Sequence, residues 1–320
     1  MSLMRITAAA MLSVVTLTRA HGQAVDVPIQ IVSPYQAGGI GGTIARMIAE
    51  HMNASFKRAV IVVNKPGAAG RIGVKAVKDS APDGSVLLFT PIAPMAIFPH
   101  VYDKLDYDPV ADFVPISQVA TFDLAVAVGA KVPSKSLAEL VAWLRANPND
   151  ATYGSPAAGS LPHFFAVLFA QATNVDLRHV AYKGNAQATV DLIGGHLPLL
   201  FTSTQDLVDT HKAGQLRVLA TSGAQRSRVL PGVPTFSEAG YRISGEGWWG
   251  IYAPAKTSSQ IAAQLNAAIV KAVNEQKVKD RLIALGLVPT GTSGPELARI
   301  QKADSDLWGP VVKASGFQAR

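Results

Sequence analysis

The chain has 320 residues, 48% of them hydrophobic and 16% charged, so it is long enough to bury a large core and too apolar to be disordered. Its net charge of +7 is spread along the sequence, which excludes the clustered basic stripe typical of nucleic-acid binding and fits a small anionic ligand better. The absence of cysteine excludes disulfides, zinc–thiolate sites, iron–sulfur clusters and cysteine nucleophiles.

Residues 1–24 have the pattern of a secretory signal peptide. A short basic start ends at Arg5, an apolar run extends from Ile6 to Leu17, and small residues flank a cleavage site after Ala24, although cleavage after Ala20 also fits. No stop-transfer pattern follows, and no later segment has the length of a membrane helix. We therefore expect an exported protein that is stabilised by its core.

A glycine-rich turn between a strand and a helix opens the mature chain. Apolar residues from Ile29 to Val32 predict a buried strand, Pro34 ends it, and a helical pattern begins near Ile44. Free N–H groups at such a helix start favour an anion, although an ordinary turn also uses glycines for its geometry. The candidate ligand contacts in this turn are Tyr35, Gln36, Ala37, Gly38, Gly39, Gly41 and Gly42.

The next two strands argue against a nucleotide cofactor. Glycines within 67–73 follow the predicted strand 59–63, but their spacing differs from the dinucleotide-binding fingerprint. No acidic residue ends the following strand, 86–89, so no cofactor is predicted. Thr90 and Pro91 lie at the carboxyl end of that strand, where parallel sheets bind ligands, and both are candidate contacts.

A second loop of small and hydroxyl residues precedes the helix predicted over 164–172. A hydrolase site there lacks the Gly-x-Ser-x-Gly motif and a recognisable triad order, and the histidines lack metal-ligand spacing, so neither catalytic residues nor a metal are predicted. We expect instead a second anion-binding loop that faces the first. The candidate contacts in this half are Ser155, Ala158, Gly159, Ser160, His163, Tyr182, Thr202 and Ser203.

Strands and helices alternate in both halves, which predicts an α/β protein with two lobes, each a mostly parallel sheet flanked by helices. We expect the chain to cross between lobes near Ala125 and to return near Gly247. Lobe 1 would then comprise 25–124 and 248–320, and lobe 2 would comprise 125–247. Small-molecule sites tend to lie in the cleft between such lobes.

The order and spacing of these segments resemble the Bug receptors, the periplasmic solute-binding proteins of tripartite tricarboxylate transporters. The resemblance rests on Pro34-Tyr-Gln-Ala-Gly-Gly39 with Ala45-Arg46, the segments 64–73 and 82–84, Tyr153-Gly-Ser155 with Gly159-Ser160 and His163, and the segments 182–184, 192–195, 230–235 and 238–240. It implies a two-lobed Venus-flytrap fold of type II and a monomer that delivers a carboxylate to membrane subunits. It also implies that the ligand carboxylate lies between Tyr35–Gly42 and Ser155–His163, assisted by ordered water.

Position 42 departs from the family pattern, which has an acid four positions before the arginine that corresponds to Arg46. Pro156 and Ala158 likewise stand in a loop that is usually richer in glycine. Glycine at 42 removes a negative charge and some bulk, which favours a dicarboxylate or an aromatic carboxylate, unless it only relaxes the helix start. A sensor subunit that signals to a membrane kinase, and an exported hydrolase, are the alternative functions.

Overall fold

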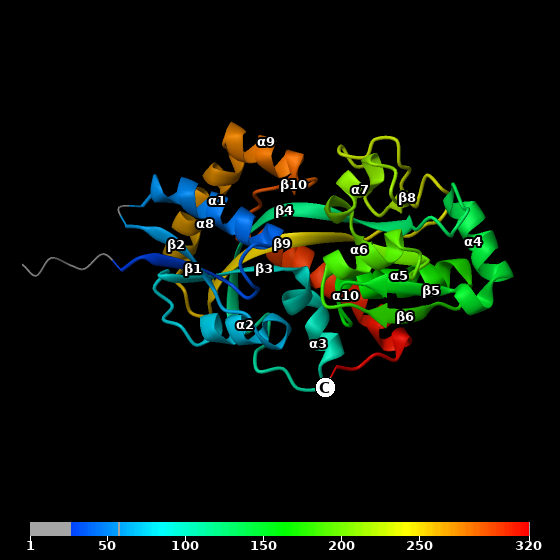
Figure 1. Ribbon diagram of the computed structural model, residues 1–320. Helices are drawn as coiled ribbons and strands as arrows, with labels where there is room; N and C mark the ends of the chain where they lie inside the picture. Colours follow the sequence, from blue (N-terminus) through cyan, green and yellow to red (C-terminus); the bar gives the residue numbers. More distant parts are fainter. Residues whose placement is uncertain (1–26, 57, 320) are drawn as a thin grey trace, which may run out of the picture.

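The computed structural model describes residues 27–56 and 58–319 (Figure 1), and the predicted signal peptide lies outside these residues. No helix within them has both the length and the apolar character needed to cross a membrane. The strands are β1 (Ile29–Ser33), β2 (Val60–Asn64), β3 (Val86–Pro91), β4 (Phe113–Val128), β5 (Thr152–Ser155), β6 (Arg178–Ala181), β7 (Leu199–Ser203), β8 (Arg217–Thr221), β9 (Glu246–Pro254) and β10 (Val288–Pro289).

Helices lie between most of these strands, as the alternating pattern predicts. The α-helices are α1 (Ile40–Asn53), α2 (Arg71–Lys78), α3 (Phe98–Val101), α4 (Leu137–Ala146), α5 (Leu161–Thr173), α6 (Asn185–Ile193), α7 (Val208–Lys212), α8 (Ser259–Asn274), α9 (Gln276–Ala284) and α10 (Gly294–Ser315). Short helical turns are η1 (Ala68–Gly70), η2 (Ala93–Ile97), η3 (Pro148–Asp150) and η4 (Thr204–Asp206).

The strands follow the order β2-β1-β3-β9-β4-β7-β5-β6, with β8 and β10 paired to β4. On one side β1 pairs in parallel with β2 and β3, and on the other β5 pairs in parallel with β6 and β7. The two parallel groups lie in separate halves of the molecule, each flanked by its own helices (Figure 1). The prediction of an α/β fold with two lobes is therefore confirmed.

Two long antiparallel strands join the lobes. Strand β4 pairs with β9 from Phe113 to Asp123, and it pairs with β7 from Leu124 onward. The sequence-based crossing points, Ala125 and Gly247, lie beside this change of partner and stay predictions.

The C-terminal helix α10 contacts both lobes, although the sequence places it in lobe 1. It packs against α3 and β4, and also against α5 of lobe 2. The Trp248 indole N–H of β9 donates to an Asp304 carboxylate oxygen of α10 at 2.7 Å. The ring of Trp308 is fully buried beside Gly245, just before β9 begins. Helix α10 therefore braces the connection between the lobes from one side.

Hydroxyl side chains fix the starts of several helices, among them α4, α8 and α10. The Oγ atoms of Ser136, Ser258 and Ser293 accept hydrogen bonds from the third residue of α4, α8 and α10 respectively. Each such cap satisfies a backbone donor that the helix itself leaves free, and is worth about 1 kcal/mol. These caps explain why the helices begin where the sequence has Ser-x-x-Glu or Ser-x-x-Ile.

The pairing of the two long strands leaves no room for a side chain at Gly247, because the Phe122 ring occupies that space. A Cβ atom there would lie 2.1 Å from the ring of Phe122. We expect Gly247→Ala to lower the free energy of unfolding by about 1–3 kcal/mol, because the buried Phe122 ring must move. Urea unfolding followed by circular dichroism measures this. Gly232→Ala is the matched control, since nothing lies within 4 Å of a Cβ at 232. Equal stability of the two variants would contradict the prediction.

Candidate functional site

A cavity of about 420 Å³ lies between the lobes at the ends of β1, β3 and β7. Its sides come from both lobes, and Phe122 of β4 and Trp249 of β9 lie at its base. The remaining lining residues are Ser33, Tyr35, Gln36, Gly39, Ile40, Gly41, Gly42, Pro91, Ile92 and Ala93 from lobe 1, and Pro156, Ser160, Leu161, Pro162, Asn185, Ser203, Gln205 and Asp206 from lobe 2.

The start of α1 forms the lobe 1 side of this cavity. Gly39 caps the helix without a side-chain hydrogen bond, and the first helical bond is Thr43 N–H to Gly39 C=O at 3.2 Å. The N–H groups of Ile40, Gly41 and Gly42 donate to no described residue. Since these three residues line the cavity, free donors at the positive end of the helix dipole are available to an anion.

Glycine at position 41 allows this helix start to lie directly on the base of the cavity. A Cβ atom at 41 would approach the six-membered ring of Trp249 to 2.5 Å. That indole is itself fixed, because it stacks on Phe89 at 5.1 Å between ring centroids with an interplanar angle of 4°. A side chain at 41 would therefore force α1 and the Trp249 ring apart.

The start of α5, on the lobe 2 side, offers far fewer free donors than the sequence suggests. Ser160 Oγ accepts the His163 N–H at 3.4 Å, and Pro162 has no N–H. The Gly159 N–H donates to His163 Nδ1 at 3.1 Å. Of the first three α5 residues, only Leu161 keeps an N–H without a partner among the described residues. The two loops are therefore unequal as anion-binding elements.

Polar side chains at the ends of β7 and α6 complete the lobe 2 side. Asp206, in η4, accepts a hydrogen bond from the Asn185 amide nitrogen. The Thr202 hydroxyl donates to the Asn185 amide oxygen at 2.6 Å and lies 3.4 Å from Asp206 Oδ2. Part of the Asp206 side chain is exposed to solvent in the cleft. The surrounding protein nevertheless desolvates its carboxyl group, and this desolvation raises the pKa of Asp206 to about 6.

The structure divides the seventeen candidate contacts into two groups. Eight line the cavity: Tyr35, Gln36, Gly39, Gly41, Gly42, Pro91, Ser160 and Ser203. The others do not: Ala37, Gly38, Thr90, Ser155, Ala158, Gly159, His163, Tyr182 and Thr202.

Several polar candidates outside the cavity are bound within the protein. The Thr90 hydroxyl donates to the Pro91 carbonyl at 3.2 Å, and the Tyr182 hydroxyl donates to an Asp191 carboxylate oxygen at 2.9 Å. Sequence reasoning missed Asn185, Gln205 and Asp206. The available signal is their position within three residues of the segment 182–184 and of the candidate Ser203.

Ser155 and two histidines form a buried group behind the lobe 2 loop. The rings of His163 and His179 stack at 4.0 Å, and His179 Nε2 lies 2.8 Å from Ser155 Oγ. The Ser155 hydroxyl is fully buried and also lies within donating distance of the Ala157 carbonyl, at 3.0 Å. This serine–histidine pair contacts the loop and not the cavity, so its geometry serves to order residues 156–160.

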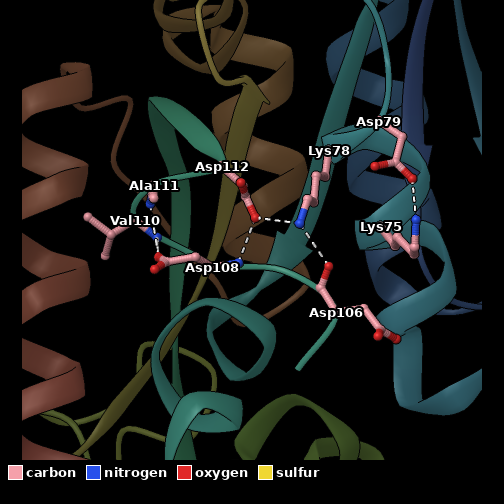
Figure 2. Close-up of polar contacts among 8 residues, drawn as sticks. All are labelled: Lys75, Lys78, Asp79, Asp106, Asp108, Val110, Ala111 and Asp112. Atoms are coloured by element: carbon pink, nitrogen blue, oxygen red, sulfur yellow. Dashed lines mark hydrogen bonds and ion pairs between the residues drawn. The ribbon is translucent and has the colours of Figure 1, made fainter. Parts of the chain in front are cut away.

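A larger hollow of about 1050 Å³ lies on lobe 1 between α10 and the loop 102–112. Its loop is ordered by its own carboxylates (Figure 2). Asp108 accepts from the N–H groups of Val110 and Ala111 at 2.8 and 2.9 Å, and Asp112 accepts from Lys78 Nζ at 2.9 Å. Five aspartates and two lysines line this hollow, and both lysines are paired with carboxylates, Lys78 with Asp112 and Lys302 with Asp306. Since such a lining repels an anion, we place the candidate anion site in the interlobe cavity.

Comparison with known proteins shows similarity over most of the chain. Residues 44–317 match the family model described as the tripartite tricarboxylate transporter family receptor. Protein BugT of Bordetella pertussis is 31% identical over 296 residues, which cover 92% of this chain and 90% of BugT.

Two solved structures share the fold over almost their whole length. Rpa4515 of R. palustris, determined with adipate, has a TM-score of 0.82 and 28% identity, covering 91% of this chain and 98% of that one. The periplasmic binding protein BugD has a TM-score of 0.79 and 27% identity, covering 92% of this chain and 99% of that one.

The stacked histidines generate a prediction about pH. Burial, together with His179, lowers the pKa of His163 from 6.5 to about 3, and burial lowers the pKa of His179 to about 4. Between about pH 6.5 and pH 4, these two histidines are protonated in the unfolded chain but stay neutral in the folded protein. Protonation therefore favours the unfolded chain, and the free energy of unfolding falls as the pH is lowered through this range.

We expect the ring NMR signals of His163 and His179 to stay unchanged between about pH 7.5 and 5.5, because both rings remain neutral. Single His163→Gln and His179→Gln variants assign the signals. A ring that titrates above about pH 6 would show that the pair is solvated.

Proposed function

Since this chain belongs to the tripartite tricarboxylate transporter family of receptors, as its motifs predicted, we propose that it binds an organic carboxylate in the interlobe cavity. In this proposal it is a periplasmic monomer that delivers the carboxylate unchanged to the membrane subunits of a transporter. Adipate in the structure of Rpa4515 supports the ligand class.

The observation that carries the proposal is the open start of α1. Three consecutive N–H groups without partners among the described residues belong to residues that line a cavity, and the described lining contains no lysine or arginine. A carboxylate there would accept charge-assisted hydrogen bonds and would also gain about 0.3–1 kcal/mol from the helix dipole. We assign this role to residues 39–42, with Tyr35, Gln36 and Pro91 beside them.

Binding from both sides implies that the lobes close on the ligand. Ser160 and Ser203 belong to lobe 2, whereas residues 39–42 belong to lobe 1, and β4 and β9 connect the two. A ligand that contacts both sides favours the conformation in which the sides are close, by its difference in affinity for the open and closed forms. We propose that this closed form is the one recognised by the membrane subunits.

Titration calorimetry with a panel of mono-, di- and tricarboxylates tests the binding step. We expect at least one to bind in the micromolar range or tighter and to be recovered unchanged by mass spectrometry after prolonged incubation. Uptake of that ligand into vesicles containing the membrane subunits should require the receptor. Consumption of the ligand would favour a hydrolase, and binding without receptor-dependent uptake would favour a sensor.

The structure also refines the argument at position 42. A Cβ atom at Gly42 would lie 3.3 Å from an Arg46 guanidinium nitrogen. An acid at 42 would therefore pair with Arg46, one helical turn later, and the negative charge felt in the cavity would be small. Glycine at 42 then changes ligand charge preference less than its position in the sequence suggests.

We expect Gly42→Asp to weaken carboxylate binding by less than about tenfold, because Arg46 neutralises the new acid. The double variant Gly42→Asp with Arg46→Ala should weaken binding by about tenfold more. Gly42→Asn is the uncharged control for bulk. Calorimetry on these folded variants would contradict the pairing if the single and double variants bound equally.

A further inference from the structure

We propose that Asp206 selects a ligand whose second functional group is a hydrogen-bond donor, such as a hydroxyl or an ammonium, and that it disfavours a second ionised carboxylate. This inference rests on the proposed function, because it takes the first carboxylate to lie at the start of α1. It concerns only the group at the other end of the ligand.

Asp206 is the single ionisable acid or base on the described cavity lining apart from the phenol of Tyr35. It belongs to lobe 2, and the free N–H groups of α1 belong to lobe 1, so the cavity has a donor side and an acidic side. An elongated ligand that fills the space between them meets both. Charge complementarity therefore calls for an anion at one end and a donor or cation at the other.

The carboxylate of Asp206 retains unused capacity as an acceptor. The amide nitrogen of Asn185 donates to Oδ2, and the nearby hydroxyl of Thr202 is directed mainly to Asn185, at 2.6 Å against 3.4 Å to Asp206. Oδ1 accepts from no described residue. Because a carboxylate accepts up to about four hydrogen bonds, a ligand donor in the cavity finds free lone pairs.

The charge state of Asp206 supports a donor as its partner. Desolvation raises its pKa to about 6, and the bonds from Thr202 and Asn185 oppose this, so the group is largely ionised at neutral pH. No lysine or arginine on the described lining compensates it. A second ligand carboxylate would face a like charge, whereas a hydroxyl or ammonium would be bound by it.

Two sets of ligands of matched length test the proposal. The first set is butyrate, γ-hydroxybutyrate, γ-aminobutyrate and succinate, and the second contains the corresponding derivatives of hexanoate, including adipate. Calorimetry with the intact protein at neutral pH should rank the hydroxy or amino acid above the dicarboxylate in the set whose length fits. Asp206→Asn should raise the dicarboxylate's affinity relative to the hydroxy acid by about tenfold, because it removes the like charge and keeps an acceptor for Asn185.

Asp209→Asn is the matched control. It removes the same charge from an exposed position on α7 that does not line the cavity, so the ranking should stay as in the unchanged protein. Thermal unfolding confirms that both variants fold. If carboxylates bind but Asp206→Asn leaves the ratio unchanged, the role of Asp206 is refuted while the proposed function stands. If no acid in either set binds to any of the three proteins, the role of Asp206 is refuted, and the proposed function is refuted as well if the whole panel of mono-, di- and tricarboxylates also fails to bind.

Discussion

The antiparallel pairing of β4 with β9 is the interaction on which the geometry of this protein depends. Its register extends from Phe113 opposite Pro254 to Asp123 opposite Glu246, and the lobes diverge where it ends. Two acidic groups, Asp123 and Glu246, therefore lie opposite each other where the strands separate. Burial, with a smaller effect of Glu246, raises the pKa of Asp123 to about 6. Because Phe122 and Trp249 come from these same strands, the pairing also fixes the base of the cavity.

The cavity offers an anion a site without a lysine or arginine on its described lining. The free donors are backbone N–H groups of α1, which are ordered by the helix itself and lose little conformational entropy on binding. A site of this kind has no cationic side chain that would stay buried and unpaired after the ligand leaves. A buried, unpaired charge is costly in free energy. This property of the site would suit the delivery of a ligand to membrane subunits that we propose.

Local sequence patterns predicted a strand, a turn and a helix around the start of α1, because Pro34 ends an apolar run and apolar residues recur at helical spacing from Ile44. The helix begins earlier than predicted, at Ile40, so Gly41 and Gly42 belong to its first turn. Local patterns could not predict which side chains of the second loop face the cavity. Ser155 turns inward because His179, on a different strand, lies 2.8 Å from it. Asp206 was missed because its proximity to α1 exists only through the pairing of β4 and β9, whereas the nearness of Arg46 to Gly42 was readable from their helical spacing.

One side of the cavity acts through its main chain and the other through its side chains, and this division affects how the protein can change over evolutionary time. Peptide groups of α1 remain whichever residues are encoded, provided that Gly41 still fits against Trp249. In contrast, one or two nucleotide substitutions would replace the side chain of Asn185, Gln205 or Asp206, and each replacement would change the chemistry of the lobe 2 lining. A gene duplicate could therefore change its ligand preference by stepwise substitution in lobe 2 while the backbone donors of α1 stayed in place.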